Sequence, residues 1–354
     1  MSSSSVIERE TRSGALQQPD PSQHLLQFTT AYVPCAALWV AAELKIADLI
    51  GDGAKSVAEL AKKTKTNEDA LFRVLRLLAM VGIFTETQPR HFALTPPAEL
   101  LRSDHPQSMR DTVVWLADPF HYKIAADLLH SVRTGEPTVE HVTGKPAFEY
   151  FPTDAVEFDR FHLAMTNLSA MAVSAALDAY NFAGCRTIVD VGGGHGFAIC
   201  SILRKYPQMR GVLFDLKDIV PGADKRIQEL GLQDRCRTEN GDFFEAVPEG
   251  GDIYFMKHIL HDWTDEQATT ILRNCRRAFD NQGKRGKIVL LEFVVPQGNA
   301  PHPSKVIDIE MLFFPGGRER MEPEWRELFA NAGFKLTKIV PTKSPFSVIE
   351  AEAA

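Results

Sequence analysis

The chain has few cysteines and no pattern that would pair them. Its 354 residues include five, an odd number, and none belongs to a C-x-x-C motif. This spacing predicts neither a disulfide framework nor a zinc site, so we expect reduced, buried thiols and a reducing compartment. The five stand in apolar contexts at Cys35, Cys185, Cys200, Cys236 and Cys275.

An excess of positive charge is also missing. Lysine and arginine number 39 against 46 aspartates and glutamates, which gives a formal net charge of -7. A protein that binds nucleic acid or acidic lipid mainly by neutralising phosphates carries the opposite balance. We therefore expect no nucleic acid and no membrane as partner, and instead a small molecule or a protein.

The N-terminus lacks a long apolar run. MSSSSVIERETRSGALQQPDPSQ contains no signal-peptide core, and LWVAAELKIADLI is broken by Glu43 and Lys45. The composition predicts a cytoplasmic protein with a disordered tail over residues 1–22. The rest of the chain is long enough, at 44% hydrophobic content, to bury the cores of two domains.

Residues 23–110 carry a winged-helix pattern. SVAELAKKT and NEDALFRVLRLLAMVG predict two helices separated by a turn, and IFTET and HFALT predict two strands after them. Asn67 is the expected cap of the second helix and Gly82 its end. Two arginines in that helix are balanced by two acids, so a packing or dimerisation role is favoured over DNA binding.

Residues 111–180 predict a helical bridge. DTVVWLADPFHYKIAADLLHSV and AVEFDRFHLAMTNLSAMAVSAALDAY read as helices joined by the loop RTGEPTVEHVTGKPAFEYF. Phe161 and Met165 could line a pocket, but an aromatic and methionine stripe at helical spacing is more often ordinary core. The pattern alone leaves their role open.

Residues 181–354 predict a Rossmann-like α/β domain. Short β-branched runs alternate with amphipathic helices, which is typical of a parallel sheet covered on both faces. The last two runs have no helix between them and predict a final antiparallel hairpin. The runs are RTIVDVGGG, GVLFDL, DIYFMK, KIVLLEFVVP, FKLTKIVP and FSVIEAE.

A glycine-rich turn, VDVGGGHG, leads from the first strand into a helix. Gly192, Gly194 and Gly196 suit a sharp turn where a ligand approaches the backbone. Phe197 breaks the dinucleotide pattern G-x-G-x-x-G, and no G-x-x-x-x-G-K-[ST] occurs. Asp215 ends the next strand, where a carboxylate can hold both ribose hydroxyls, so the pair predicts a nucleoside.

Asp242 and Phe243 follow the third strand. A carboxylate can accept a hydrogen bond from an exocyclic amine while an aromatic ring covers the flat base, which favours adenine. Alone, Asp242 would fit a turn residue that caps its own backbone. The fourth strand ends in MKHILHDWTDE, which puts His258 and His261 at the ligand-binding edge of the sheet. His258 fits a pocket or a buried, backbone-bonded histidine equally well.

Taken together, these motifs resemble the S-adenosylmethionine-dependent O-methyltransferases of the caffeate and hydroxyindole type. The likeness covers nearly the whole chain and implies a class I methyltransferase domain, S-adenosylmethionine as cofactor, and a homodimer formed through the N-terminal domain. Residues 111–180 would then be a bridge and substrate lid, and 181–354 the catalytic domain. The motifs are IVDVGGGHG, FDL, GDFF, MKHILHDW, LLEF and FPGGRERM.

The resemblance also implies residue roles. His261 matches the catalytic base, and Glu292 and Glu319 match its flanking acids. No metal is expected. The implied cofactor contacts are Gly192, Asp215, Leu216, Asp242, Phe243 and Lys257, and the expected substrate contacts are Phe161, Met165, Asp262 and Phe314.

The chemistry of methyl transfer agrees with these roles. A phenol has a pKa of about 10, so its oxygen becomes a good nucleophile only as its proton leaves. Histidine, with a pKa of about 6.5, can start neutral and take that proton. Either Glu292 or Glu319 could bind the far ring nitrogen and stabilise the imidazolium.

Two departures from the family pattern bear on the ligands. His195 stands where many relatives have a small hydroxyl residue, which alters contacts near the methionine end of the cofactor. Phe313 and Phe314 replace polar residues of plant relatives and indicate an apolar, polycyclic aromatic substrate. Two alternatives are hydroxylation or decarboxylation on the same fold and cofactor, and a metabolite-sensing winged-helix regulator.

Overall fold

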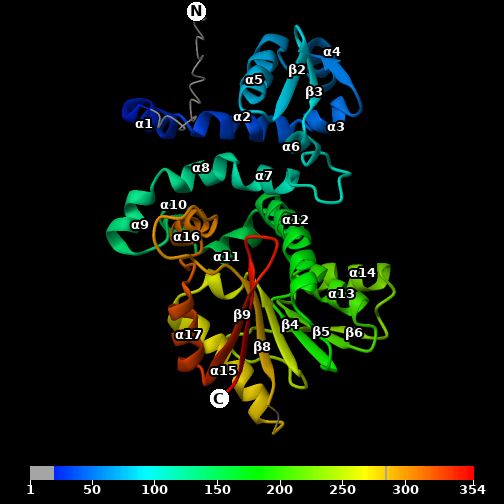
Figure 1. Cartoon of the computed structure of the whole chain (residues 1–354), viewed down its shortest axis with the longest axis vertical. Helices are drawn as coiled ribbons and strands as arrows, with labels where there is room; N and C mark the ends of the chain where they lie inside the picture. Colours follow the sequence, from blue (N-terminus) through cyan, green and yellow to red (C-terminus); the bar gives the residue numbers. More distant parts are fainter. Residues whose placement is uncertain (1–19, 284) are drawn as a thin grey trace, which may run out of the picture.

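The computed structural model describes residues 20–283 and 285–354. The expected disordered tail lies outside these residues except at its end, where Pro21 already opens helix α1. Figure 1 shows the N-terminal helices and the large sheet at opposite ends of the molecule, with α7 to α12 between them.

The N-terminal region combines helices with a small antiparallel sheet in the order β1-β3-β2. Asn67 caps α5 by accepting a hydrogen bond from the backbone N–H of Ala70, and Gly82 follows that helix with φ +79°, as expected. Cys35 on α2 is exposed, which differs from the expected burial. The elements are α1 (Pro21–Thr29), α2 (Tyr32–Glu43), α3 (Ile46–Ile50), β1 (Ala54–Ser56), α4 (Val57–Thr64), α5 (Glu68–Met80), β2 (Phe84–Gln88), β3 (His91–Leu94) and α6 (Pro96–Glu99).

The bridge is divided into more and shorter helices than the sequence predicts. Asp118 caps a new helix with Pro119 in its first turn, so the first predicted helix becomes three. The predicted loop carries two further short helices, which end at Gly144 and at a 3-10 turn. The elements are α7 (Arg110–Leu116), α8 (Pro119–Ala125), α9 (Leu128–Thr134), α10 (Thr138–Thr143), α11 (Ala147–Tyr150) and α12 (Ala155–Ala179).

The C-terminal region is built on a seven-stranded sheet in the order β6-β5-β4-β7-β8-β10-β9. Its strands run parallel except β10, which is antiparallel to both neighbours, so the predicted hairpin is confirmed. The elements are β4 (Thr187–Val191), α13 (Phe197–Lys205), β5 (Arg210–Asp215), α14 (Val220–Glu229), β6 (Cys236–Asn240), β7 (Ile253–Lys257), α15 (Asp265–Asp280), β8 (Lys287–Glu292), α16 (Ser304–Phe313), α17 (Glu322–Asn331), β9 (Phe334–Pro341) and β10 (Ser347–Ala353).

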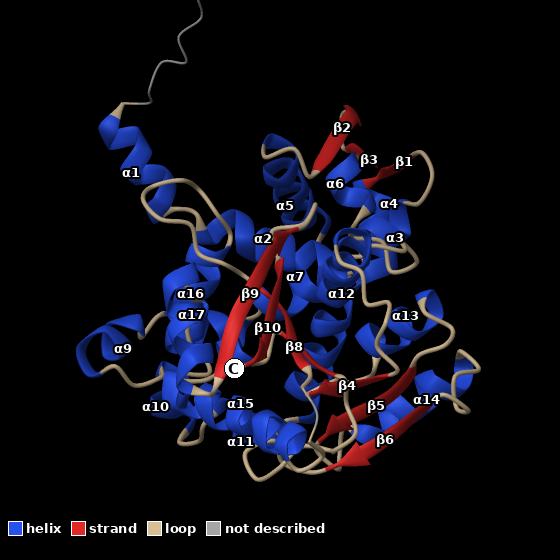
Figure 2. Cartoon of the chain, turned by 60° about the horizontal axis from the view of Figure 1, so that its bottom comes forward, coloured by secondary structure: helices blue, strands red, loops and turns tan. Residues whose placement is uncertain are grey.

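Apolar side chains cover both faces of this sheet. The cores pack α12, α13 and α14 on one face and α15 and α17 on the other. Figure 2 shows the strands as one twisted sheet among helices. Because β4 to β8 run parallel, their carboxyl ends meet at one edge of the sheet. The side chains within these strands are buried on both faces, so the polar groups collect at that edge.

Candidate active site

The glycine loop after β4 is packed too closely for side chains. A Cβ atom on Gly192 would lie 2.5 Å from the Ile259 side chain, and one on Gly193 would lie 2.8 Å from Leu213. Gly194 has a positive φ of +55°, and its backbone N–H donates to Asp215. The loop thus brings bare backbone to the sheet edge, next to the chain segment that carries His261.

Asp215 joins this loop to the neighbouring strand. Its two carboxylate oxygens accept hydrogen bonds from the backbone N–H groups of Gly194 and Leu216, both at 2.7 Å. Burial raises the pKa of Asp215, although both hydrogen bonds lower it. Each oxygen keeps a lone pair for a further donor, as a ribose hydroxyl would supply.

Asp242 and Phe243 lie beyond the end of β6. Asp242 accepts a hydrogen bond from the backbone N–H of Phe244 at 2.8 Å, so one oxygen has the turn-capping role considered above. Asn274 of α15 donates to the carbonyl oxygens of Phe243 and Phe244 and fixes this turn. The half-buried Phe243 ring meets Trp263 edge to face, with centroids 5.9 Å apart. The ring of Phe243 therefore lies at the sheet edge next to the carboxylate of Asp242.

Asp190 and Lys257 lie beneath the loop. Burial raises the pKa of Asp190 to about 7 despite Lys257, and one Asp190 oxygen has no hydrogen-bond partner among the described residues. Burial lowers the pKa of Lys257, although Glu292 and Asp190 raise it. Asp190 had no predicted role, although an acid inside the strand VDVGGG was the signal.

His261 lies on a 3-10 turn, Leu260–Asp262, directly after β7. Its Nδ1 is 2.8 Å from Glu319 Oε1, and its Nε2 is 3.4 Å from Asp262 Oδ1. Burial lowers the pKa of His261, but Asp262, Glu292 and Glu319 outweigh burial and raise it to about 10. Acids near both ring nitrogens thus favour the protonated form of the ring. The role of His261 as a base that starts neutral stays a prediction.

Glu292 hydrogen-bonds to the turn and not to the ring. Its Oε1 accepts hydrogen bonds from the backbone N–H groups of Ile259 and Leu260 at 3.0 and 3.1 Å. Burial raises the pKa of this carboxyl to about 7. Of the two acids considered for the far ring nitrogen, Glu319 is the one in contact.

The loop FPGGRERM clamps the same turn. A Cβ atom on Gly317 would collide with the backbone oxygen of His261, which already accepts a hydrogen bond from the Arg318 N–H at 2.8 Å. The fully buried Arg320 donates to the carbonyl oxygens of Leu260 and Trp263 at 2.7 and 2.9 Å. Gly317 and Arg320 had no predicted role, although their motif was recognised.

Three of the four predicted substrate contacts belong to one aromatic cluster, whereas Asp262 lies on the turn beside His261. Phe314 is buried, whereas Phe161 and Met165 are half-buried at its border. Phe161 stacks on Phe151, with centroids 4.8 Å apart. Phe148 lies 5.3 Å from Trp263 and so joins the cluster to the turn that carries His261.

His121 packs against this cluster and had no predicted role. Its Nδ1 lies 3.0 Å from Asp118, its Nε2 lies 3.3 Å from Glu310 of α16, and its ring stacks on Phe314 at 5.4 Å. Burial lowers the pKa of His121, but Asp118 and Glu310 raise it to about 9. A cationic imidazole thus ties α8 to α16.

Two other histidines lie near the loop. His258 is buried with φ +53° beside the stacked rings of Phe293 and Phe346, and its Nε2 has no partner among the described residues. Burial holds its pKa well below the usual value, so the ring is neutral. His195 stacks on His162 of α12, with centroids 4.9 Å apart.

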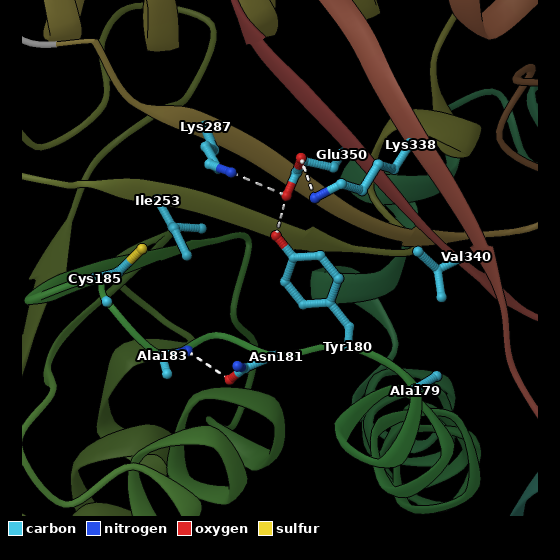
Figure 3. Close-up of a pocket in the computed structure, with 11 residues that line it drawn as sticks. Ala179, Tyr180, Asn181, Ala183, Cys185, Ile253, Lys287, Lys338, Val340 and Glu350 are labelled. Atoms are coloured by element: carbon cyan, nitrogen blue, oxygen red, sulfur yellow. Dashed lines mark hydrogen bonds and ion pairs between the residues drawn. The ribbon is translucent and has the colours of Figure 1, made fainter.

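A separate cavity of about 420 Å³ lies at the other edge of the sheet (Figure 3). The buried Glu350 accepts hydrogen bonds there from Tyr180, Thr337 and Lys287, and pairs with Lys338. These contacts join the end of α12 to the last hairpin. Because Glu350 is fully satisfied, we interpret this cluster as structural.

The His261 cluster also has the donors of a cation site. Ligand atoms of His261, Glu292 and Glu319 lie within 4.8 Å of one another. The expected absence of a metal therefore stays a prediction.

Comparison with known proteins agrees with this geometry. A model of the O-methyltransferase domain matches residues 125–335, and a model of the O-methyltransferase dimerisation domain matches residues 26–104. The phenazine O-methyltransferase PhzM of Lysobacter antibioticus is 43% identical over 331 residues, which span 93% of this chain and 96% of that protein.

Two further relatives bear on the chemistry. The neocarzinostatin-biosynthesis O-methyltransferase NcsB1, solved with S-adenosylmethionine and 2-hydroxy-5-methyl naphthoic acid, is 31% identical, with a TM-score of 0.77 over 91% of this chain and 96% of that one. Aclacinomycin 10-hydroxylase RdmB of Streptomyces purpurascens is 34% identical over 305 residues, or 85% of this chain and 81% of that protein. The resemblance seen in the sequence is confirmed: the chain belongs to the O-methyltransferase family, with its dimerisation domain at the N-terminus.

Proposed function

We propose that this S-adenosylmethionine-dependent O-methyltransferase methylates a hydroxyl group of a small, apolar aromatic metabolite, with His261 as general base. The observation that carries the proposal is the contact between two loops. Ile259, two residues before His261, packs against the Gly192 backbone. A cofactor on the glycine loop and a base on the turn would therefore share one pocket.

The residues of the sheet edge fit the cofactor. The glycine loop leaves room for backbone contacts, Asp215 has acceptor capacity for the ribose, and Asp242 with Phe243 suits adenine. Leu216 beside Asp215 and Lys257 at the end of β7 complete the proposed set. S-adenosylmethionine supplies the methyl group on its sulfonium sulfur.

The acids around His261 fit a base that ends the reaction charged. Nε2 would take the hydroxyl proton while Glu319 holds Nδ1 and stabilises the imidazolium. Asp262 would orient the hydroxyl, and Phe161, Met165 and Phe314 would pack on a flat ring. The named substrates of PhzM and NcsB1 support this class, since a phenazine and a naphthoic acid are both polycyclic aromatics.

A labelled-methyl assay tests the function. The protein is incubated with methyl-labelled S-adenosylmethionine and a panel of hydroxylated phenazines, naphthoates and quinones. We expect label on the product and one S-adenosylhomocysteine per methyl ether. The RdmB relative makes hydroxylation the second candidate, which predicts an oxidised product with the cofactor unconsumed.

We also propose a cytoplasmic homodimer. The stretch Pro21–Glu43 is long and apolar enough, by length and composition, to cross a membrane, and 17% of its most apolar window is buried. It is divided into α1 and α2, and it overlaps the dimerisation match. A second copy of the chain is therefore the proposed cover for the exposed Leu25, Leu26 and Phe28.

A further inference from the structure

A pair of histidine rings joins the glycine loop to the helix that carries two of the proposed substrate contacts. His195 lies in the loop between two glycines that both have a positive φ. Its ring stacks on the ring of His162 of α12, with centroids 4.9 Å apart and planes 23° from parallel. α12 runs from the bridge to the large sheet and also carries Phe161 and Met165 (Figure 1).

The His195 ring is also packed against α14. A Cβ atom on Gly222 of that helix would lie 2.5 Å from Cδ2 of the ring, so a glycine is what leaves room for the ring there. α14 follows β5, whose last residue, Asp215, accepts a hydrogen bond from the backbone N–H of Gly194. The position of the His195 ring therefore depends on the glycine loop and on the segment after β5, the two parts proposed to hold the cofactor.

His162 continues the series of ring contacts on α12. Its ring meets Phe158 and Phe161 edge to face, with centroids 4.4 and 5.2 Å apart. Phe161 in turn stacks on Phe151 and meets Trp115 edge to face. Ring contacts thus run without a break from the glycine loop to the aromatic cluster that is proposed to pack on the substrate.

Both imidazoles are neutral in this stack. Burial and the neighbouring His195 lower the pKa of His162 to about 4. Burial and Arg226 lower the pKa of His195, although Asp159 raises it. Two neutral rings at this separation attract each other, whereas two cations would repel. The stack is therefore a favourable contact at neutral pH.

We infer that His195 and His162 are positioning residues through which the bound cofactor organises the aromatic cluster. The inference rests on the proposed function. S-adenosylmethionine on the glycine loop would fix His195, and the stack would fix the first turns of α12 and with them Phe161. The aromatic substrate would then bind more tightly to the cofactor-loaded protein. Because coupling between two sites is reciprocal, the cofactor would bind more tightly to the substrate-loaded protein by the same factor.

Hydrogen exchange on the full-length protein tests this with S-adenosylhomocysteine alone. Amide exchange over residues 158–165 of α12 is followed by mass spectrometry with and without that ligand. We expect the ligand to slow exchange there by about two- to tenfold, the range that one aromatic contact adds to an equilibrium. His162→Ala should lose this slowing but keep the slowing over the glycine loop. Absence of slowing over 158–165 in the unaltered protein, or equal slowing there in His162→Ala, would overturn the inference.

Three further variants separate the ring contact from a general loss of packing. His162→Phe keeps an aromatic ring and should restore the slowing over 158–165. His195→Ser removes the ring from the loop, leaves α12 unaltered, and should abolish the slowing as His162→Ala does. His141→Ala is the matched control, because it breaks a separate histidine stack, formed with His130 at 4.1 Å, and should leave the slowing unchanged. Failure of His162→Phe to restore the slowing, or its loss in the control, would count against the inference.

Kinetics test the link to the substrate. With an acceptor found in the labelled-methyl assay, His162→Ala should raise the KM for that acceptor by about two- to tenfold and change kcat less. An unchanged KM would contradict the inference. Absence of methyl transfer with every hydroxylated aromatic would instead count against the proposed function, and the exchange experiment would still decide whether the cofactor organises α12.

Discussion

His261 is the residue on which the proposed chemistry depends. Its ring is buried, bound by Glu319, and placed on a turn in contact with the glycine loop. His261→Gln keeps a polar side chain but removes the base, so turnover should fall by about 100- to 10,000-fold. Calorimetry with S-adenosylhomocysteine should show unchanged affinity. His91→Gln, on β3 of the N-terminal region, is the control, and unchanged turnover in His261→Gln would remove the base assignment.

Glu319 should set the strength of that base. Glu319→Gln can still accept the Nδ1 hydrogen bond but lacks the charge that raises the pKa of His261. The imidazole is the active form and exists above its pKa. Lowering that pKa therefore moves the acid limb of the kcat/KM profile to lower pH, while the weaker base lowers the plateau. A limb that stays in place in the pH–rate profile would show that another group titrates there.

Arg320 and its loop hold the whole turn that carries His261 in place. Its guanidinium binds carbonyl oxygens on both sides of His261 while fully buried. Arg320→Met would leave both carbonyl oxygens without this donor and should therefore cost about 2–6 kcal/mol in the free energy of unfolding and reduce turnover. Arg318→Met is the matched control, since its side-chain ion pairs are half-exposed and such pairs contribute at most about 1 kcal/mol. Urea unfolding compares the two, and equal losses would contradict this account.

Elements with strong local signals could be predicted from the sequence, and those fixed by packing could not. The strand FKLTKIVP and the helix after Asn67 appear where periodicity and capping put them. The chain over 111–151 breaks into short helices because its apolar residues pack around the aromatic cluster, which has no local signature.

The same division holds at the site. His261, Asp215 and the glycine loop follow strand ends and were predictable. The choice of Glu319 over Glu292 was not, because it depends on a loop 58 residues further along the chain meeting the turn. The roles of Arg320 and His121 depend on the same kind of long-range contact.

At the scale of the whole molecule, the exposed apolar face of α1 predicts association. Leu26 and Phe28 are 62% and 71% exposed. Replacing both with glutamate should weaken the dimer by about 30-fold or more per residue, as for central contacts of an interface. Sedimentation velocity measures the change. Leu230→Glu, at an apolar residue after α14 that is 41% exposed, should not alter the sedimentation, and an unchanged double variant would exclude α1 from the interface.

The His121–Glu310 pair would link the fit of the substrate to the strength of the His261 base. Glu310 lies on α16, and the chain continues from that helix through Phe314 to Glu319, whose backbone N–H donates to Asp308 of the same helix. The acid that contacts the imidazole is thus attached to the helix that ends at Phe314, a proposed substrate contact. On the proposed function, a flat molecule that packs firmly against α16 would hold Glu319 against Nδ1, and a poorly fitting one would weaken the base. Selection among aromatics would then act through proton transfer as well as through affinity.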